Sequence, residues 1–328
     1  TANGQVLSST TAGVLSWATD SLPDASVTAA KIASGLQLVT TDAQSNTVVG
    51  TNAGDSFSGT DAERNVLIGT DAGTAITTGD NNIAIGYETL SANTTGANNT
   101  GLGYRALKAN TTGSQSTAIG RNSLASSTTA DANTAVGYNS LLNNTTGTNN
   151  TSVGKEVLST NTTASDNTSV GNQSLKANTT GERNNAFGSG ALNDNTTANN
   201  NNAFGYQALA VNTTGASNNA FGKSCLDANT TGSGNTAMGH NTLGANTTAS
   251  NNTGFGYQVL ANNTTGYQNT AIGSSALATN TEGYNNVAVG FNSLNANTTG
   301  DMNIAMGYEA LYANTTADSN VGIGHKAL

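Results

Sequence analysis

The hydrophobic and polar positions of this chain recur with one strict period over most of its length. In each repeat an apolar residue precedes a glycine, a leucine follows that glycine after four residues in all copies but the first, and Asn and Thr fill much of the remainder. The glycine occurs at 69, 86, 103, 120, 137, 154, 171, 188, 205, 222, 239, 256, 273, 290, 307 and 324, so the period is seventeen. A period of this size predicts stacked coils, because one repeat cannot bury its apolar face alone.

The local sequence favours strands and turns within each repeat. The segment Thr270–Gly273 is short, partly β-branched and bounded by Asn and Gly, which is typical of a strand. The segment Asn93–Gly96 reads Asn-Thr-Thr-Gly, a poor helix former and a good turn former. The Ala-Leu-x-Ala segment fits either a second short strand or one helical turn. Two short strands and two corners fit a repeat of this length, so we predict an all-β fold, a parallel β-solenoid or β-roll.

Three rows of equivalent positions describe the expected packing. The leucine row begins at Leu90, Leu107 and Leu124 and continues to Leu328, and we expect it in a core. The apolar row, the residue before each glycine, is also expected in a core; it includes Ile85, Leu102, Ile119, Val136, Phe187 and Met238. The small-residue row precedes it, holds only Ala, Ser or Gly from Ala84 onward, and faces the opposite side of the strand. We expect another chain against the small-residue row, and because a single thin coil buries little, we predict a parallel homotrimer.

Glycine and asparagine rows are the predicted structural ladders. The first glycine (Gly69, Gly86, Gly103, Gly120 and their equivalents) is never replaced, which indicates positive φ or a contact too close for a Cβ. The second glycine row, which begins at Gly96, holds Ala in five copies and therefore does not require positive φ. The first asparagine row includes Asn65, Asn82, Asn99 and Asn133, with Ser116 as an exception, and the second includes Asn93, Asn110, Asn144 and Asn161. Stacked at about 4.8 Å, such side chains are expected to form amide ladders.

The repeats divide the chain into three parts. Residues 1–40 do not repeat and are interpreted as a linker or attachment module, with Trp17 and a short helical stretch near Ser26–Ala33. Residues 41–64 form an irregular first coil, because the step from Gly50 to Gly69 is longer than the period, and residues 65–328 form the regular array. The chain begins and ends in mid-pattern, so we expect a segment of a longer polypeptide.

Composition limits the function. Charged residues are only 9%, against roughly 25% in ordinary soluble domains. The net charge of −9 disfavours a nucleic-acid partner, and no apolar run is long enough to insert into a membrane. One cysteine, Cys225, excludes an intrachain disulfide and is expected to be a small buried thiol. His240 and His325 lie five coils apart, too far to share a metal.

No sequence pattern indicates an enzyme, a cofactor or a metal site. The acidic residues form no recurring pair, and the glycines fit no dinucleotide or Walker pattern. The Asn-Thr-Thr triplets match the N-glycosylation acceptor pattern, which we interpret as turn chemistry of the repeat. Tyrosines follow the glycine in several coils, and Tyr267 and Tyr284 lie at a corner. They are candidate contacts for a surface glycan, although packing along the row is the simpler interpretation.

The Asn-Thr-Ala-Ile-Gly segment at Asn269–Gly273 resembles the head repeats of trimeric autotransporter adhesins, and Thr117–Gly120 matches it in part. That resemblance implies a left-handed parallel β-roll that trimerises, although the family repeat is usually a little shorter. The Asn-Thr-Thr-Gly repeats also look like those of bacteriophage tail-fibre proteins. The phrases Ala2–Leu7, Leu15–Ala18 and Ser26–Ile32 resemble linkers common in tail fibres.

These patterns and resemblances predict a segment of a trimeric phage tail fibre that extends from the virion and supports host recognition. The expected partners are the chain itself, other virion tail proteins and a host cell-surface glycan or protein. The alternative is a bacterial surface adhesin or extracellular filament, and a membrane anchor elsewhere in the gene would favour it. An ice-binding solenoid is a third class. It needs a flat row of exposed Thr, and the adjacent Thr-Thr pairs do not place both side chains on one strand face.

Overall fold

The computed structural model describes residues 5–9, 15–19, 40–41, 44–57 and 61–328 of the chain. The chain divides into two compact units, Thr1–Thr40 and Thr41–Leu328. In the first unit, β1 (Gln5–Ser9) and β2 (Leu15–Thr19) form an antiparallel pair that places Leu7 opposite Trp17. The helical stretch expected near 26–33 lies outside the described residues.

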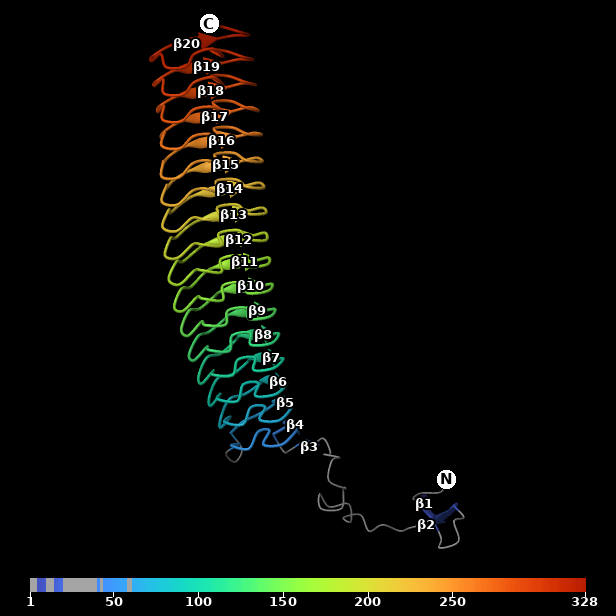
Figure 1. The fold of residues 1–328 in the computed structure, drawn as a ribbon. Helices are drawn as coiled ribbons and strands as arrows, with labels where there is room; N and C mark the ends of the chain where they lie inside the picture. Colours follow the sequence, from blue (N-terminus) through green and yellow to red (C-terminus); the bar gives the residue numbers. More distant parts are fainter. Residues whose placement is uncertain (1–4, 10–14, 20–39, 42–43, 58–60) are drawn as a thin grey trace. The chain divides into compact units, whose positions relative to one another are not determined.

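The second unit is a column of coils stacked through one parallel ladder (Figure 1). Its strands follow the short β3 (Thr40–Thr41): β4 (Thr47–Val49), β5 (Val66–Ile68), β6 (Ile83–Ile85), β7 (Thr100–Leu102), β8 (Thr117–Ile119), β9 (Thr134–Val136), β10 (Thr151–Val153), β11 (Thr168–Val170), β12 (Asn185–Phe187), β13 (Asn202–Phe204), β14 (Asn219–Phe221), β15 (Thr236–Met238), β16 (Thr253–Phe255), β17 (Thr270–Ile272), β18 (Val287–Val289), β19 (Ile304–Met306) and β20 (Val321–Ile323). The described residues contain no helix. The predicted all-β parallel β-solenoid is therefore confirmed.

Strand pairing follows the sequence period. From β5 to β20, each strand pairs in parallel with the next at the sequence separation of one repeat, as in Thr151 opposite Thr168. The pairing of β4 with β5 spans a longer separation, with Thr47 opposite Val66, because the irregular first coil is longer. We define each regular coil as the segment from one position of the first asparagine row to the residue before the next such position, for example 167–183.

Each coil has one short strand, so the expectation of two strands was wrong. The Ala-Leu-x-Ala segment lies in a turn in which its leucine and the residue two places before that leucine adopt left-handed backbone angles, as Leu260 (φ 50°) and Gln258 (φ 52°) do. A third left-handed residue precedes the first asparagine row, for example Gln268 at φ 56°. The chain therefore turns through left-handed residues at sharp corners, which a second strand or a helical turn would not provide.

The left-handed positions explain why the leucine row contains no Ile or Val. Left-handed angles are costly for β-branched side chains. None of the three rows of left-handed positions contains Val, Ile or Thr at any coil from Arg64 onward. Leu supplies a large apolar side chain without a branched Cβ, so both its burial and its backbone angle restrict the position.

The first glycine row satisfies both conditions predicted for it. Gly69, Gly86, Gly103 and Gly120 have φ between +132° and +134°. A Cβ on Gly86 would lie 2.4 Å from the carbonyl oxygen of Gly103, so the coils stack too closely for a side chain. The second glycine row has no such left-handed angle, which agrees with the Ala residues found there.

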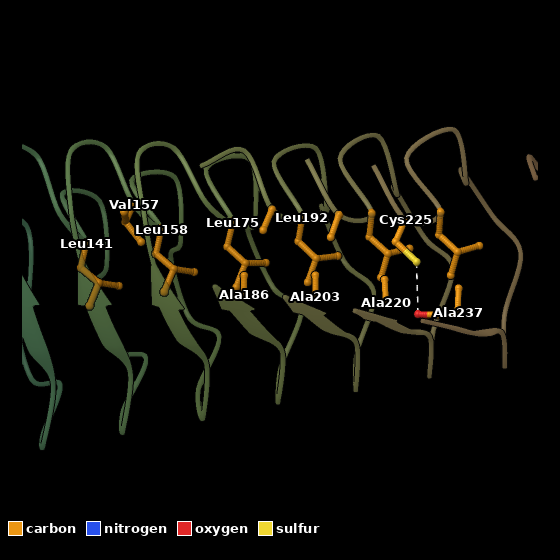
Figure 2. Close-up of a cluster of buried hydrophobic side chains, with 14 of the residues drawn as sticks. Leu141, Val157, Leu158, Leu175, Ala186, Leu192, Ala203, Ala220, Cys225 and Ala237 are labelled. Carbon is orange, nitrogen blue, oxygen red and sulfur yellow. Dashed lines mark hydrogen bonds between the residues drawn. The ribbon is translucent and has the colours of Figure 1, made fainter. Parts of the chain in front are cut away.

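The core lies inside each coil and consists of the leucine row and the small-residue row. Leu90, Leu107 and Leu124 are fully buried, and so are Ala84 and its equivalents. Figure 2 shows later members of both rows, such as Leu192 and Ala203. The expectation for the apolar row was wrong: its side chains point outward, and Leu102 is 43% exposed. Because the leucine side chain fills the narrow interior, only a small residue fits opposite it. The small-residue row is thus explained within one chain and does not require another.

A third row of side chains also points into the interior of the coils. It directly precedes the leucine row and holds Thr89 and Thr242 as its threonine members. In the coil that follows each of these threonines, the small-residue position is glycine, at Gly101 and Gly254. A Cβ on Gly101 would lie 2.5 Å from Thr89 Cγ2, and one on Gly254 would lie 2.7 Å from Thr242 Cγ2. At these two places a threonine in one coil therefore accompanies a glycine in the next.

Candidate functional site

The outward side chains of β4–β20 form a continuous half-buried to exposed surface, which we call the strand face. It consists of the first and third residue of every strand, and none of these residues is charged. Several of its large apolar members are exposed, including Ile119, Met238, Ile272 and Met306. Sequence reasoning missed this surface because it placed the apolar row in the core. An uncharged apolar surface of this length is typical of a protein interface.

The strand face changes character along the shaft. Five consecutive coils place Thr at its first position, from Thr100 to Thr168, beside Leu, Ile or Val. The next three coils place Asn and Phe there. The rings of Phe187, Phe204 and Phe221 stack with centroids 4.8 Å apart. Asn185 donates to Asn202, and Asn202 donates to Asn219, each at 2.8 Å. The surface therefore has a flat threonine section followed by an aromatic section.

The second asparagine row forms an amide ladder inside the corner. Asn110 Nδ2 donates to Asn93 Oδ1 at 2.8 Å, and Asn93 Nδ2 donates to the Gly96 carbonyl at 2.9 Å. Both side chains are fully buried. The Asn of the Asn-Thr-Thr triplets therefore closes the turn. A glycan on Nδ2 would have no room in the folded coil.

The first asparagine row anchors the backbone of the next coil. Asn99 donates its backbone N–H to Asn82 Oδ1 at 3.0 Å. Asn82 Nδ2 donates to the Gly96 carbonyl at 2.9 Å, which is the carbonyl that Asn93 also contacts. Two buried amides therefore converge on one corner carbonyl in such a coil. In this row the ladder runs mainly from side chain to backbone.

Coil 116–132 lacks both amides. Ser116 replaces the first asparagine and Ser127 replaces the second. Asn133 still donates its backbone N–H to Ser116 Oγ at 3.3 Å, but Asn110 Oδ1 and Ser127 Oγ are buried without a partner. Among the described side chains only Thr74 Oγ1 shares that condition. This coil is thus a gap in both asparagine rows.

The corner tyrosines stack along the shaft. Tyr267 and Tyr284 lie parallel with ring centroids 4.9 Å apart, and Tyr267 is 43% exposed. The carboxylate of Asp301 raises the pKa of Tyr284 by its charge and by a hydrogen bond. Stacking covers one face of each ring, the face that lies against its neighbour.

Ion pairs bridge neighbouring coils outside the strand face. Glu88 contacts Arg105 at 2.8 Å and Lys108 at 2.6 Å, and hydrogen bonds from Lys108, Tyr87 and Arg105 lower the pKa of Glu88 to about 2. Glu156 contacts Lys176 at 2.9 Å in the same way, and this lysine is the main cause of its lowered pKa. These pairs fix side-chain rows between coils, and their geometry offers no pair of carboxylates for acid–base chemistry.

The remaining candidate residues are structural in their surroundings. Cys225 is buried, its Sγ donates to the Ala237 carbonyl at 3.1 Å (Figure 2), and burial raises its thiol pKa to about 12. His240 stacks on Tyr257 and His325 on Tyr308. Within the described ranges, no three His, Cys, Asp or Glu side chains gather as a metal site would require. The same residues include no helix with the length and hydropathy needed to cross a membrane.

Comparison of the chain with known protein families, with curated proteins and with solved structures gives no significant match. Function is therefore inferred from the geometry of the solenoid, above all from the strand face.

Proposed function

We propose that this chain is a structural segment of a trimeric phage tail fibre. In this proposal it extends from the virion, joins other tail proteins and supports attachment to a glycan or protein of the host surface. The observation that carries the proposal is the strand face, which is uncharged along all seventeen coils from β4 to β20 and carries an outward row of apolar side chains, several of them exposed. Such a surface favours burial against further copies of the same chain, because association removes it from water.

The dimensions of the strand face suit that role. Sixteen steps of about 4.8 Å give a length of about 77 Å, and three residues at about 3.3 Å give a width of about 10 Å. The resulting footprint of about 770 Å² is close to the roughly 800 Å² per partner that stable interfaces bury. Parallel copies in register would repeat each contact at every coil, and the rod would multiply weak host contacts through avidity.

The mass of the chain in solution tests this proposal. Sedimentation equilibrium is expected to give a mass near three times 32.7 kDa. Replacing Ile119 and Phe204 on the strand face by Lys should release monomers, because each copy would bring charges into an apolar interface. The matched control places Lys at Tyr138 and Tyr257, which are exposed on another row. A monomeric wild type, or a trimer unaffected by the strand-face pair, would contradict the proposal.

A bacterial surface adhesin or extracellular filament of the same fold remains the alternative, since the same interface serves both. A membrane-anchor domain encoded in the same gene would favour the adhesin. One observation favours the ice-binding class as well: the threonine section from Thr100 to Thr168 forms a regular row, although it lies on the strands and not at the Thr-Thr corners. A thermal-hysteresis assay tests that class, and hysteresis together with a monomeric mass would replace the fibre proposal.

A further inference from the structure

A single glycine interrupts a side-chain row on the corner surface. The second residue after each invariant glycine forms this row, and Gln173, Gly190 and Gln207 are consecutive members of it. All three adopt left-handed angles, with φ of 55°, 69° and 55°. A Cβ on Gly190 would meet only Gln207 Cγ, at an ordinary contact distance of 3.5 Å. Neither the backbone nor the packing requires glycine here, so its effect is to leave space.

The missing side chain opens a hollow of about 350 Å³. Its walls include Gln173, Asn193, Asp194, Tyr206 and Val211. A second hollow of about 550 Å³ shares Val211 and includes Asp227, Asn241 and Asn262. The first volume lies within the roughly 300–1,000 Å³ typical of small-molecule sites. The two hollows have Val211 as a common wall residue, and together we call them the groove.

The polar groups of the first hollow are held in place. Gln173 Nε2 donates to Glu156 Oε2 at 2.9 Å. Asn193 Nδ2 donates to the Gln173 carbonyl at 2.8 Å, which directs its Oδ1 away from that bond. Asp194 forms no ion pair with any described cation. A fixed amide and a carboxylate without a cationic partner are suited to hydrogen bonds with hydroxyl groups.

Tyr206 differs from the other aromatic residues of its row. Tyr87 stacks on Tyr104, Tyr257 on His240 and Tyr308 on Phe291, and Arg121 lies over the ring of Tyr138. Among the described residues, neither a ring nor an Arg covers Tyr206, because its neighbours along the row are Ser189 and Lys223. The side chain is 52% exposed beside the hollow. Its ring is therefore available to a ligand.

We propose that this groove binds a neutral sugar unit of a glycan, with the ring of Tyr206 against the apolar face of the sugar. The side chains of Asn193, Asp194 and Gln207 would form hydrogen bonds with the hydroxyl groups of the sugar. Asp194 and Asp227 disfavour anionic ligands through charge repulsion. The inference rests on the proposed attachment function, which it makes specific by naming the ligand class and the coils concerned.

The test is to close the hollow without disturbing the fold. Gly190→Gln would extend the row of Gln173 and Gln207, whose backbone angles glutamine already tolerates in this chain. Binding of methyl glucoside, methyl galactoside, methyl mannoside and N-acetylglucosamine to the full chain is measured by saturation-transfer NMR. At least one sugar is expected to bind at millimolar concentration, with affinity at least about tenfold lower in Gly190→Gln.

Two tyrosine variants and the association variant complete the experiment. Tyr206→Ala should weaken binding by a similar factor, and Tyr138→Ala, on the same row away from the groove, should leave it unchanged. Failure of all four sugars to bind, or equal binding by Gly190→Gln, would overturn the inference. Sugar binding by the variant with Lys at Ile119 and Phe204 would show that the groove acts without association. Sugar binding by a wild type that proves monomeric would remove the fibre proposal and keep the groove.

Discussion

Coils 116–132 and 167–183 follow the same backbone path with different buried chemistry. Gly120 and Gly171 have φ of 132° and 140°, and Leu124 and Leu175 have φ of 49° and 48° and are fully buried. In coil 167–183, Asn167 and Asn178 both donate to the Gly181 carbonyl, at 3.0 and 2.9 Å. In coil 116–132 both positions are Ser, and Ser127 Oγ has no partner. The glycine and leucine rows therefore suffice for the path, and the amides contribute local stability.

The largest loss of stability is expected from replacing the invariant glycine, which both coils share. Gly120→Ala and Gly171→Ala each place a Cβ at positive φ, at 2.5 Å from the Gly137 carbonyl oxygen and 2.4 Å from that of Gly188. Strain and overlap together should cost about 4 kcal/mol in either coil. Chemical denaturation followed by circular dichroism measures the loss. Gly181→Ala is the matched control: a Cβ there would also lie 2.4 Å from a carbonyl oxygen, that of Ala198, but φ is not positive. Both neighbouring coils carry Ala at this position, at 164 and 198, so the coils can adjust to it, and the cost should be less than about 1 kcal/mol.

The next experiment copies the gap into the intact coil. Replacing both Asn167 and Asn178 by Ser removes two buried donors and leaves partners such as Asn161 Oδ1 unpaired. The expected cost is about 3 kcal/mol, because each orphaned buried group costs about 1–3 kcal/mol. Hydrogen exchange should accelerate in coils 150–200 and remain unchanged near the distant coil 286–302, since solenoid coils contact only their neighbours. Uniform acceleration along the shaft would contradict local control by the amides.

Repairing the gap is expected to have a smaller effect of the opposite sign. Replacing both Ser116 and Ser127 by Asn should stabilise coil 116–132 by about 1–2 kcal/mol, because Asn110 Oδ1 gains a donor and the corner carbonyl of Ala130 gains two. Exchange of the amides in β8 is the measurement, and it should slow toward the rates of β11. Either single replacement serves as the control and should recover only part of the gain. A loss of stability would show that the backbone has already adapted to the gap.

The smallest expected effect is a difference in stability between the two coils at acidic pH. Lys176 and Gln173 lower the pKa of Glu156, whose ordinary value is 4.5, so the folded protein keeps this carboxylate charged below that pH. The stabilisation is present above pH 4.5 and is lost as the pH falls through the lowered pKa. No described ion pair involves coil 116–132. Hydrogen exchange, corrected for its intrinsic pH dependence, should therefore accelerate on acidification in coil 167–183 and not in 116–132. Glu156→Gln should remove that difference.

The sequence predicts much of this backbone and less of its inward and outward faces. A glycine present in all sixteen coils indicates its positive φ, and a leucine row of this regularity indicates burial. The alternation of a strand shows that Ala84 and Ile85 face opposite sides, but it does not show which side is inside. That depends on the interior volume left beside Leu90, which only the closed coil determines.

Two features of the sequence could have shown which side of the strand faces the interior. Thr89 is followed by Gly101, and Thr242 by Gly254, so a larger side chain in one row accompanies a smaller one in the other. Such compensation indicates that both rows share one interior. The left-handed corners were likewise visible as rows without Val, Ile or Thr. The groove beside Gly190 could not be inferred from the period, because it depends on which neighbouring rings and side chains leave space uncovered.

The in-register pairing of β5–β20 also has a genetic consequence. Most coils meet their neighbours through the same carbonyls, amides and glycines, so duplication or deletion of one repeat's codons usually joins two surfaces that already match. Local exceptions, such as Thr89 with Gly101 and the two serines of coil 116–132, limit where such an event leaves stability unchanged. Unequal recombination between repeats can thus change the length of the shaft in steps of about 4.8 Å without new mutations in the core. Shaft length becomes a quantity that replication errors can adjust and selection can tune.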